Sequence, residues 1–541
     1  MQCTPPPITF IPCEEHFRPV LPTIQGNVDY LALRGQLTTM DELLRTSGIE
    51  NEFVMRSLNH WIKTLSQSEV EQIELSGEGQ SGVIRLEDLV SGKQQARFQE
   101  QSVRALRCSI ARTLLVGSFR DFAARLADSP LLQWFCQVAQ LDRVKVPAKS
   151  TVQRYATWLP EEEMREVINV LLCKAGAAMA AGKQALDLEE PLDLSTMFLD
   201  STCVKANIHF PVDWVLLRDG VKSLMQSVEL IRTHGLRSRM CEPQVFITKI
   251  NSLSMEMTHT RRKKNGHKER KRVLREMKAV VTVVRAHAQR YHTLLDENWQ
   301  ATDWTRPQAE QVLKRLESMI EALPAAVKQA HERIIGERQV ANDEKLLSLF
   351  EPDIHVIVRG KADAEVEFGN LLVLGEQSDG LIIDWELFKE EVPADVRLVR
   401  PSVERVESGL GLSLKSLVTD RGFDNKMNLQ WLEERGTFAG LCPRDPRALR
   451  EAMKDQHFAQ AQRRRAQTEG RIAIFKNEFL GRPMRAEGFA NRNLQVSWGV
   501  LTHDLWVIAE KLREQRKIRE QKLRQAFAPT EVPTAISSRI R

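Results

Sequence analysis

The sequence lacks the long apolar run that a membrane-spanning helix requires. Its 541 residues contain no stretch of about 18 uncharged apolar side chains, so we expect no transmembrane helix. The first residues, "MQCTPPPITFIPCEEHF", have neither a basic start nor an apolar core, which argues against a signal peptide. The eight cysteines are scattered, without a CxxC or zinc-type spacing, which is typical of free thiols in a reducing compartment. We therefore expect a cytoplasmic protein without a membrane partner.

The chain also has no large excess of positive or negative charge, since its net charge is only +5, but its basic residues are clustered. Runs of Lys and Arg occur at 260–272, 462–467 and 511–524. A solvated helix face explains the third run equally well, because Glu514 and Glu520 interleave its cations. The first run, "TRRKKNGHKERKR", has one acid among thirteen residues and favours a polyanionic partner. The cations at its centre are Arg261, Arg262, Lys263 and Lys264.

The N-terminal third of the chain divides into two parts. Residues 1–85 are weakly patterned and start Pro-rich, so we expect a weakly structured segment. Residues 86–185 have helical periodicity, with Ser118 as a helix cap and Pro130 in the first turn of another helix. Short capped helices of this kind are typical of a helix-turn-helix DNA reader, although a plain helical bundle fits the same pattern.

A basic helix in this region is predicted to bind DNA ends. In "KSTVQRY", Ser150 is placed as the cap and Gln153 follows three residues later, which is the signature of a capping box. Lys149 and Arg154 are the nearest cations for contacts with phosphates or bases.

The remainder of the chain mixes helical and β-rich segments. Residues 215–345 read as almost wholly helical, and short β-rich runs fill 353–385. Two apolar runs that read as strands each end on an acid. Met197-Phe198-Leu199 leads to Asp200, and a run from Leu414 through Val418 leads to Asp420. We therefore predict a mixed α and β fold in which two strand ends present carboxylates.

A third acid, Glu469, lies on a predicted helix. At about 3.6 residues per turn, Gln462, Arg465, Glu469 and Lys476 fall within about 60° of one another. A salt-bridge ladder explains this face by itself. Together with Asp200 and Asp420, however, Glu469 completes a set of hard oxygen ligands that could hold two Mg²⁺ ions for phosphodiester cleavage.

The three motifs, in their order along the chain, resemble the DDE transposases of bacterial insertion sequences, whose catalytic core is ribonuclease H-like. The matching pieces are "DSTCVKANIHFPVDWVLLRDGV", "VTDRGFDN" and the helix containing "EGRIAIFKNEF". That family has a helix signature of Tyr, two residues, Arg, three residues, Glu, six residues and Lys. Arg465, Glu469 and Lys476 keep this spacing, whereas Gln462 stands at the Tyr position.

The resemblance implies a fold, an activity and partners. The catalytic domain would span 190–510, interrupted by the helical insertion at 215–345 and followed by a basic tail at 511–541. Asp200, Asp420 and Glu469 would be the catalytic residues and would bind two Mg²⁺ (or Mn²⁺) ions. Arg465 and Lys476 would contact DNA.

The expected activity is cleavage of DNA at the ends of the element and transfer of the freed 3′-OH to target DNA, by a homodimer associated with the bacterial nucleoid. A ribonuclease H-like nuclease without strand transfer and a transposase-derived DNA-binding regulator are the alternatives.

Overall fold

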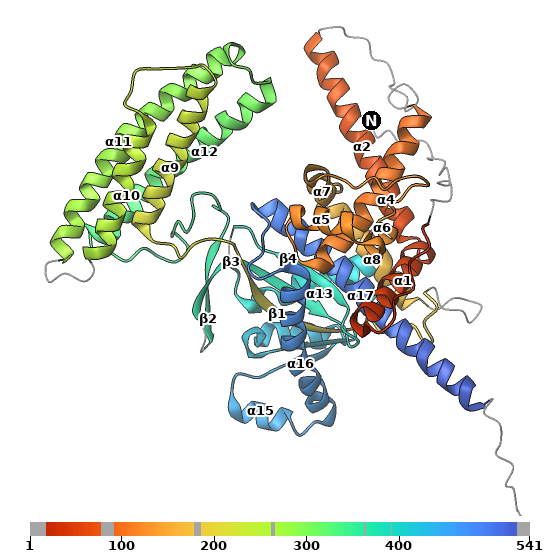
Figure 1. Ribbon diagram of the computed structural model, residues 1–541. Helices are drawn as coiled ribbons and strands as arrows, with labels where there is room; N and C mark the ends of the chain where they lie inside the picture. Colours follow the sequence, from red (N-terminus) through yellow and green to blue (C-terminus); the bar gives the residue numbers. More distant parts are fainter. Residues whose placement is uncertain are drawn as a thin grey trace, which may run out of the picture.

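The computed structural model describes residues 18–76, 91–177, 186–260, 266–361, 364–390 and 392–526. The described chain has a mixed α and β architecture (Figure 1), with a central six-stranded sheet, N-terminal helices on one side and a projecting module of helices on the other. No helix of these described ranges is both long and apolar enough to cross a membrane.

The sheet combines antiparallel and parallel strands. Its strands are β1 (Thr196–Lys205), β2 (His355–Lys361), β3 (Ala364–Glu376), β4 (Ile382–Leu387), β5 (Ser416–Thr419) and β6 (Phe438–Leu441). The order is β2-β3-β1-β5-β6, and β4 also pairs with β3. Strand β3 runs antiparallel to its three partners, whereas β1, β5 and β6 are mutually parallel. Strand β5 has four residues, of which Leu417, Val418 and Thr419 are buried, as expected for a strand covered on both faces.

The helical insertion forms a separate module between β1 and β2. It consists of α9 (Asp213–Thr233), α10 (Pro243–Thr260), α11 (Gly266–Asn298), the short turn η1 (Trp299–Ala301) and α12 (Arg306–Ile334). These helices have their own apolar core, which includes Leu224, Met277 and Leu323. Because this core is separate from that of the sheet, the module projects from the body as a distinct bundle (Figure 1).

The N-terminal segment 1–85 was expected to be weakly structured, and for the described residues this expectation is wrong. Helices α1 (Val28–Thr46) and α2 (Ile49–Ser76) pack into the main core. Leu37, Met40 and Leu44 form a buried stripe at helical spacing, and α1 lies against the distant C-terminal helix. The stripe has low contrast in the sequence because the polar residues Gln36, Thr39 and Asp41 are buried beside the apolar ones.

The region 86–185 is helical, as far as it is described. It contains α4 (Gly92–Leu115), α5 (Phe119–Asp128), α6 (Pro130–Phe135), α7 (Lys149–Ala156) and α8 (Glu161–Gly176). Ser118 caps α5 and Ser129 caps α6, with Pro130 in the first turn. The predicted cap at Ser150 is wrong. Helix α7 begins at Lys149 after Ala148, so the backbone of Ser150 is already helical and its side chain cannot cap the helix.

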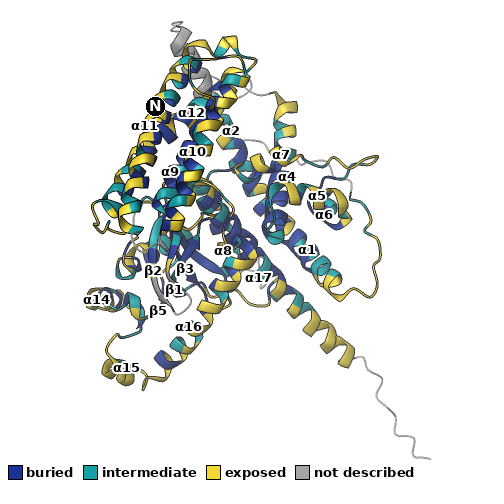
Figure 2. Cartoon of the chain, turned by 60° about the vertical axis from the view of Figure 1, so that its left-hand side comes forward, coloured by how far each residue is buried: buried dark blue, intermediate teal, exposed yellow. Residues whose placement is uncertain are grey.

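The C-terminal half completes the layers around the sheet. Its helical elements are η2 (Asp395–Arg397), α13 (Val399–Leu410), η3 (Arg421–Phe423), α14 (Lys426–Glu434), α15 (Pro446–Ala452), α16 (Gln456–Ile474), the π-helical segment η4 (Phe475–Leu480) and α17 (Phe489–Ala526). The first part of the expected basic tail, 511–526, continues α17 and becomes exposed as the helix leaves the body (Figure 2), and 527–541 lie outside the described residues.

Candidate active site

Asp200 and Asp420 lie side by side because of the pairing between β1 and β5. The last parallel pair of these strands is Leu199 with Thr419. Asp200 and Asp420 are the residues that directly follow this pair along the chain. Strand β1 was predicted to end on Asp200, and this is wrong, because antiparallel pairing with β3 extends it to Lys205. The acid therefore lies in the middle of β1, at the carboxyl end of its parallel segment.

Backbone donors fix the orientation of both carboxylates. Asp200 Oδ1 accepts a hydrogen bond from the Ser201 N–H at 2.7 Å. Asp420 Oδ1 accepts one from the Gly422 N–H at 2.8 Å and thereby caps the turn η3. Because these donors belong to the chain next to each acid, the local backbone holds the two carboxylates in place.

Helix α16 carries Glu469 and is attached to strands β3 and β1. Arg464 donates to Glu376 on β3 at 2.7 Å, and its guanidinium lies 4.6 Å from the ring centre of Phe198 on β1. Arg471 also pairs with Glu376, whose carboxylate is almost fully buried. Since buried charges of this kind resist separation, the helix is held across the sheet in a fixed register.

Gln462, at the position where the resembling family has Tyr, links α16 to the ends of the parallel strands. Its amide nitrogen donates to the carbonyl oxygens of Thr419 at 3.2 Å and Gly440 at 2.8 Å. Its amide oxygen accepts from Arg465 Nε at 3.2 Å. The departure therefore supplies a contact between the helix and the strand that precedes Asp420, a role that the sequence alone did not suggest.

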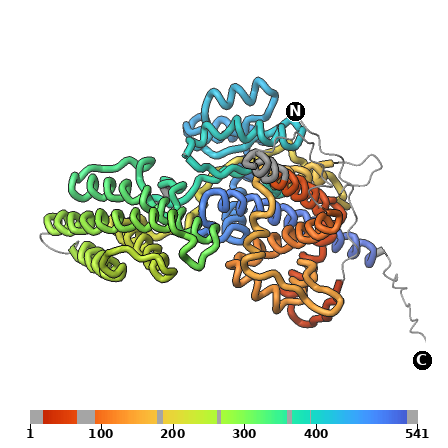
Figure 3. The backbone as a smooth tube through the Cα atoms, turned by 90° about the horizontal axis from the view of Figure 1, so that it is seen from above, coloured from red at the N-terminus to blue at the C-terminus, as the bar shows by residue number. Residues whose placement is uncertain are grey.

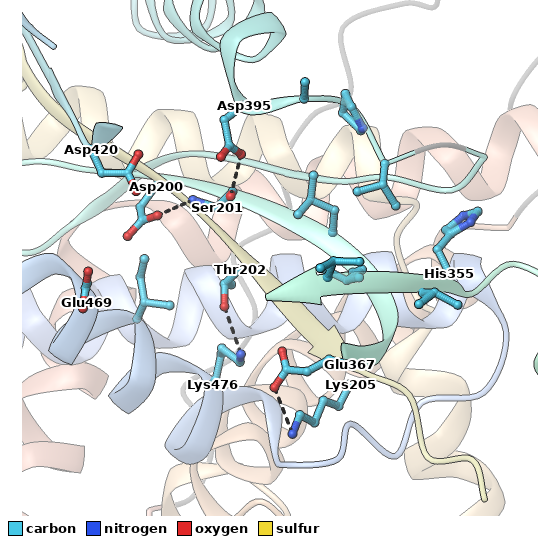
Figure 4. A pocket seen from close by; sticks show the side chains of 18 of the residues that line it. Asp200, Ser201, Thr202, Lys205, His355, Glu367, Asp395, Asp420, Glu469 and Lys476 are labelled. Carbon is cyan, nitrogen blue, oxygen red and sulfur yellow. Dashed lines mark hydrogen bonds and ion pairs between the residues drawn. The ribbon is translucent and has the colours of Figure 1, made fainter. Parts of the chain in front are cut away.

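The three acids line one cavity of about 1110 Å³. Figure 4 shows Asp200 and Asp420 together on the strands and Glu469 facing them from the helix. Lys476 lines the same cavity and donates to Thr202 Oγ1 at 3.0 Å. Arg465 does not line the cavity, but it lies 4.0 Å from Glu469. Glu478, the next acid along the chain after Glu469, is exposed and outside the cavity lining.

The electrostatics of the cavity favour cations. Burial, together with the neighbouring charges of Asp420 and Glu469, raises the pKa of Asp200 to about 6 against the opposing effects of the Ser201 N–H and Arg465. Lys205, Lys476 and Arg482 are the Lys and Arg side chains that line the cavity within the described part of the chain. They face the three acids and four further carboxylates of the lining, which are Asp343, Glu367, Glu390 and Asp395.

The donor set fits divalent metal ions in its chemistry. Asp200, Asp420 and Glu469 offer hard carboxylate oxygens, which are the ligands that Mg²⁺ prefers. Among the residues that the structure describes, no three His, Cys, Asp or Glu side chains are already close enough to share one ion. To share an ion with Asp200 and Asp420, the Glu469 carboxylate would have to move toward them. Its side chain is 61% exposed, so buried neighbours do not hold it in place.

Asp395 is a fourth acid beside the pair on the strands. Its Oδ1 accepts from Ser201 Oγ at 2.8 Å (Figure 4). A Cβ placed on Gly422 would lie 2.5 Å from Asp395 Oδ2 and 3.1 Å from Asp420 Oδ1, so a larger residue there would displace the Asp395 carboxylate. No sequence pattern marks Asp395, because it begins the three-residue turn η2, which is too short for periodicity, and it reaches the site only through the fold.

The predicted DNA-binding residues of the other regions lie apart from the cavity. Lys149 and Arg154 are exposed on α7. Arg261, Arg262, Lys263 and Lys264 lie outside the described residues. In the described remainder of that basic run, Lys271 pairs with Glu337, and Arg272 pairs with acids at 256 and 276. Part of the run is therefore neutralised within the module.

Comparison with known proteins gives no relative. No protein-family model, no curated protein and no solved structure matches the chain.

The raised pKa of Asp200 gives a prediction that needs no assay of activity. The folded state retains a proton on Asp200 up to about pH 6, whereas the unfolded chain releases it near pH 3.8, so this group's contribution to stability falls as the pH rises through that window. Without metal, Asp200→Asn should raise the free energy of unfolding by about 2–3 kcal/mol at about pH 8 and by little near pH 4. Urea unfolding of the full chain measures this difference.

Added Mg²⁺ provides the second half of this measurement. It should stabilise the original chain, because bound ions neutralise the acids, and should stabilise Asp200→Asn much less. Asp343→Asn is the matched control, since Asp343 lines the same cavity but is exposed. Equal stabilities of the Asp200→Asn variant and the original chain at both pH values would contradict the assigned environment of Asp200.

Proposed function

We propose that the chain is a DDE-type transposase that cuts DNA at the ends of its element and joins the 3′-OH to target DNA. The observation that carries the proposal is the convergence of Asp200, Asp420 and Glu469 on one cavity from two parallel strands and a helix. Asp200 lies more than 200 residues from the other two acids in the sequence and gains nothing structural from meeting them, since their mutual repulsion opposes folding.

The order of the strands supports a ribonuclease H-like core. In the resembling family the first Asp belongs to the first core strand, and the second Asp follows the fourth. Strands β2 and β4 each pair with β3 alone. With β2 counted as an addition at this edge, the core consists of β1, β3, β4, β5 and β6. Counted in this way, Asp200 lies on the first strand and Asp420 follows the fourth.

The chemistry requires metal ions that Asp200, Asp420 and Glu469 would hold. When bound, such ions activate the attacking water or 3′-OH and stabilise the charge that develops on the phosphate. The backbone bonds of Asp200 and Asp420 fix the two strand ligands. Lys476, which lines the same cavity, is placed to orient a phosphate that the ions do not reach. No nucleophilic side chain is needed for either step.

The excess of carboxylates in the cavity also makes a prediction about DNA. A phosphate backbone would be repelled by the metal-free site, so DNA should occupy the cavity only when divalent ions are present. This requirement couples substrate placement to metal binding.

The test uses the full chain and duplexes taken from the DNA that flanks its reading frame. With Mg²⁺ we expect cleavage at the element's ends and joining of the 3′-OH to a plasmid. Lys476→Gln should lower joining about 10- to 100-fold while duplex affinity changes less than about threefold, because positioning at the reacting centre counts for more than binding. Gel analysis of joined products and fluorescence anisotropy measure the two effects.

Arg463→Gln is the matched control, since Arg463 is an exposed cation on the same helix that does not line the cavity. It should leave both measurements unchanged. Nicked products without joined ones would identify a nuclease instead, and specific binding of the ends without cleavage in Mg²⁺ would identify a regulator.

A further inference from the structure

A group of exposed cations lies after Asp420 in the sequence and is not part of the candidate active site. This group, here called the α15 surface, consists of Arg421, Lys426, Arg444, Arg447 and Arg450. Arg447 and Arg450 are one helical turn apart on α15, and Arg444 precedes them by the same interval. Arg421 directly follows Asp420, so the surface begins at the candidate active site.

Arg444 connects this surface to the turn that carries Asp420. Its guanidinium donates to the carbonyl oxygens of Arg421 at 2.9 Å and Gly422 at 2.8 Å. Its backbone N–H donates to Asp424 Oδ2 at 2.8 Å. The position of α15 relative to Asp420 is therefore defined by three hydrogen bonds.

The positive charges of the α15 surface are available to bind an anionic partner. None of the five forms an ion pair with a carboxylate within the described ranges. Two neighbouring acids are occupied by backbone donors, since Asp424 accepts from Arg444 and Asp445 caps α15. By contrast, Lys271 and Arg272 of the insertion are paired with acids.

The chemistry of this surface fits the backbone of a nucleic-acid duplex. Exposed Arg and Lys side chains at helical spacing can follow successive phosphates without reading bases. Stacking on unpaired bases would need an exposed aromatic ring. The nearby Trp431 is covered instead by the guanidinium groups of Arg400 and Arg435, which lie 5.3 and 4.7 Å from its ring centre.

We infer that the α15 surface binds the target duplex into which the 3′-OH is joined. The inference rests on the proposed function. Figures 1 and 3 place α15 and the N-terminal helices α4–α7 on opposite sides of the body, with the sheet and α17 between them. An element end held by the N-terminal region reaches the acids from that side, which leaves the α15 surface for the second duplex.

The first experiment measures binding alone, by anisotropy of a duplex of about 30 base pairs and arbitrary sequence, in EDTA. Removing the metal excludes the acid site from the measurement. The double variant Arg447→Gln, Arg450→Gln should reduce the slope of log K against log salt by about 1.8, which is about 0.9 per phosphate contact. The ratio of the DNA-binding constants of the original chain and the variant should then fall about tenfold between roughly 50 and 200 mM salt.

The control carries Lys314→Gln and Lys328→Gln, two exposed cations of α12 without ion pairs within the described ranges. Its slope should equal that of the original chain. An unchanged slope in the α15 variant would overturn the inference whether or not the chain is a transposase. Gln has nearly the same helix propensity as Arg, so α15 should stay folded in the variant.

The second experiment separates the two duplexes in the joining reaction. The α15 variant should cut element ends at the original rate and join them to a plasmid about tenfold less well at about 200 mM salt. An equal loss of cleavage and joining would mean that the surface holds the element's end, which overturns the assignment to target DNA. Absence of any cleavage by the original chain would refute the proposed function, while the salt slope would still decide whether the surface binds DNA.

Discussion

Asp200→Asn, Asp420→Asn and Glu469→Gln should each lower Mg²⁺-dependent DNA cleavage by at least about a thousandfold. Each change keeps the size of the side chain and removes one anionic ligand from the cavity that the three acids share. The metal ions would then be lost or misplaced, and with them the charge that stabilises the transition state. Cleavage of an end-containing duplex, followed on denaturing gels, measures the loss.

Glu478→Gln is the control for this set. Glu478 lies nine residues after Glu469 and is exposed outside the cavity. It should cleave as the original chain does, and all four variants should bind the duplex in EDTA with unchanged affinity. Full cleavage by Glu469→Gln combined with none by Glu478→Gln would show that the third ligand is wrongly assigned.

Arg107→Met should lower the free energy of unfolding by about 3 kcal/mol, because it removes the buried cation that Asp41 and Glu50 share. Asp41 then keeps its ion pair with Arg18 at 2.7 Å, whereas Glu50 loses its partner. Arg107 is fully buried and pairs with Asp41 of α1 and Glu50 of α2. It also donates to the carbonyl oxygen of Phe135 at 3.0 Å. The loss should therefore loosen the N-terminal helices, and urea unfolding of the full chain measures it.

Arg45→Met tests the same carboxylate from the surface. Arg45 lies 3.9 Å from Asp41, but its side chain is 58% exposed. Exposed pairs of this kind contribute about 0–1 kcal/mol, so the variant should unfold almost as the original chain does. Equal losses for the two variants would mean that α1 and α2 are not fixed by the buried network.

Local sequence determined the elements whose signals are contained within a few residues. Ser118 and Ser129 cap helices because each hydroxyl needs only the next three residues as partners. The helical insertion was predictable from its own periodicity, since the module buries its apolar faces within itself. The residue types and spacing of Asp200, Asp420 and Glu469 also predicted a shared site, and the structure places all three in the lining of one cavity.

Tertiary structure decided whatever depends on partners far away in the chain. Helix α1 was missed because its buried face packs on α17, where Gln36 donates to the carbonyl oxygen of Trp506 at 2.8 Å. The end of β1 was misplaced because pairing with β3 extends the strand beyond Asp200. Such contacts are set by three-dimensional packing, which overrides local propensity.

The same reason explains the parts of the site that the sequence did not show. Gln462 was a departure from a signature until the fold placed the carbonyl groups of Thr419 and Gly440 beside its amide. Asp395 is one acid among many until Ser201 donates to it. A sequence specifies which groups are available, but hydrogen bonds between distant residues exist only after the strands and helices have packed and brought donors and acceptors together.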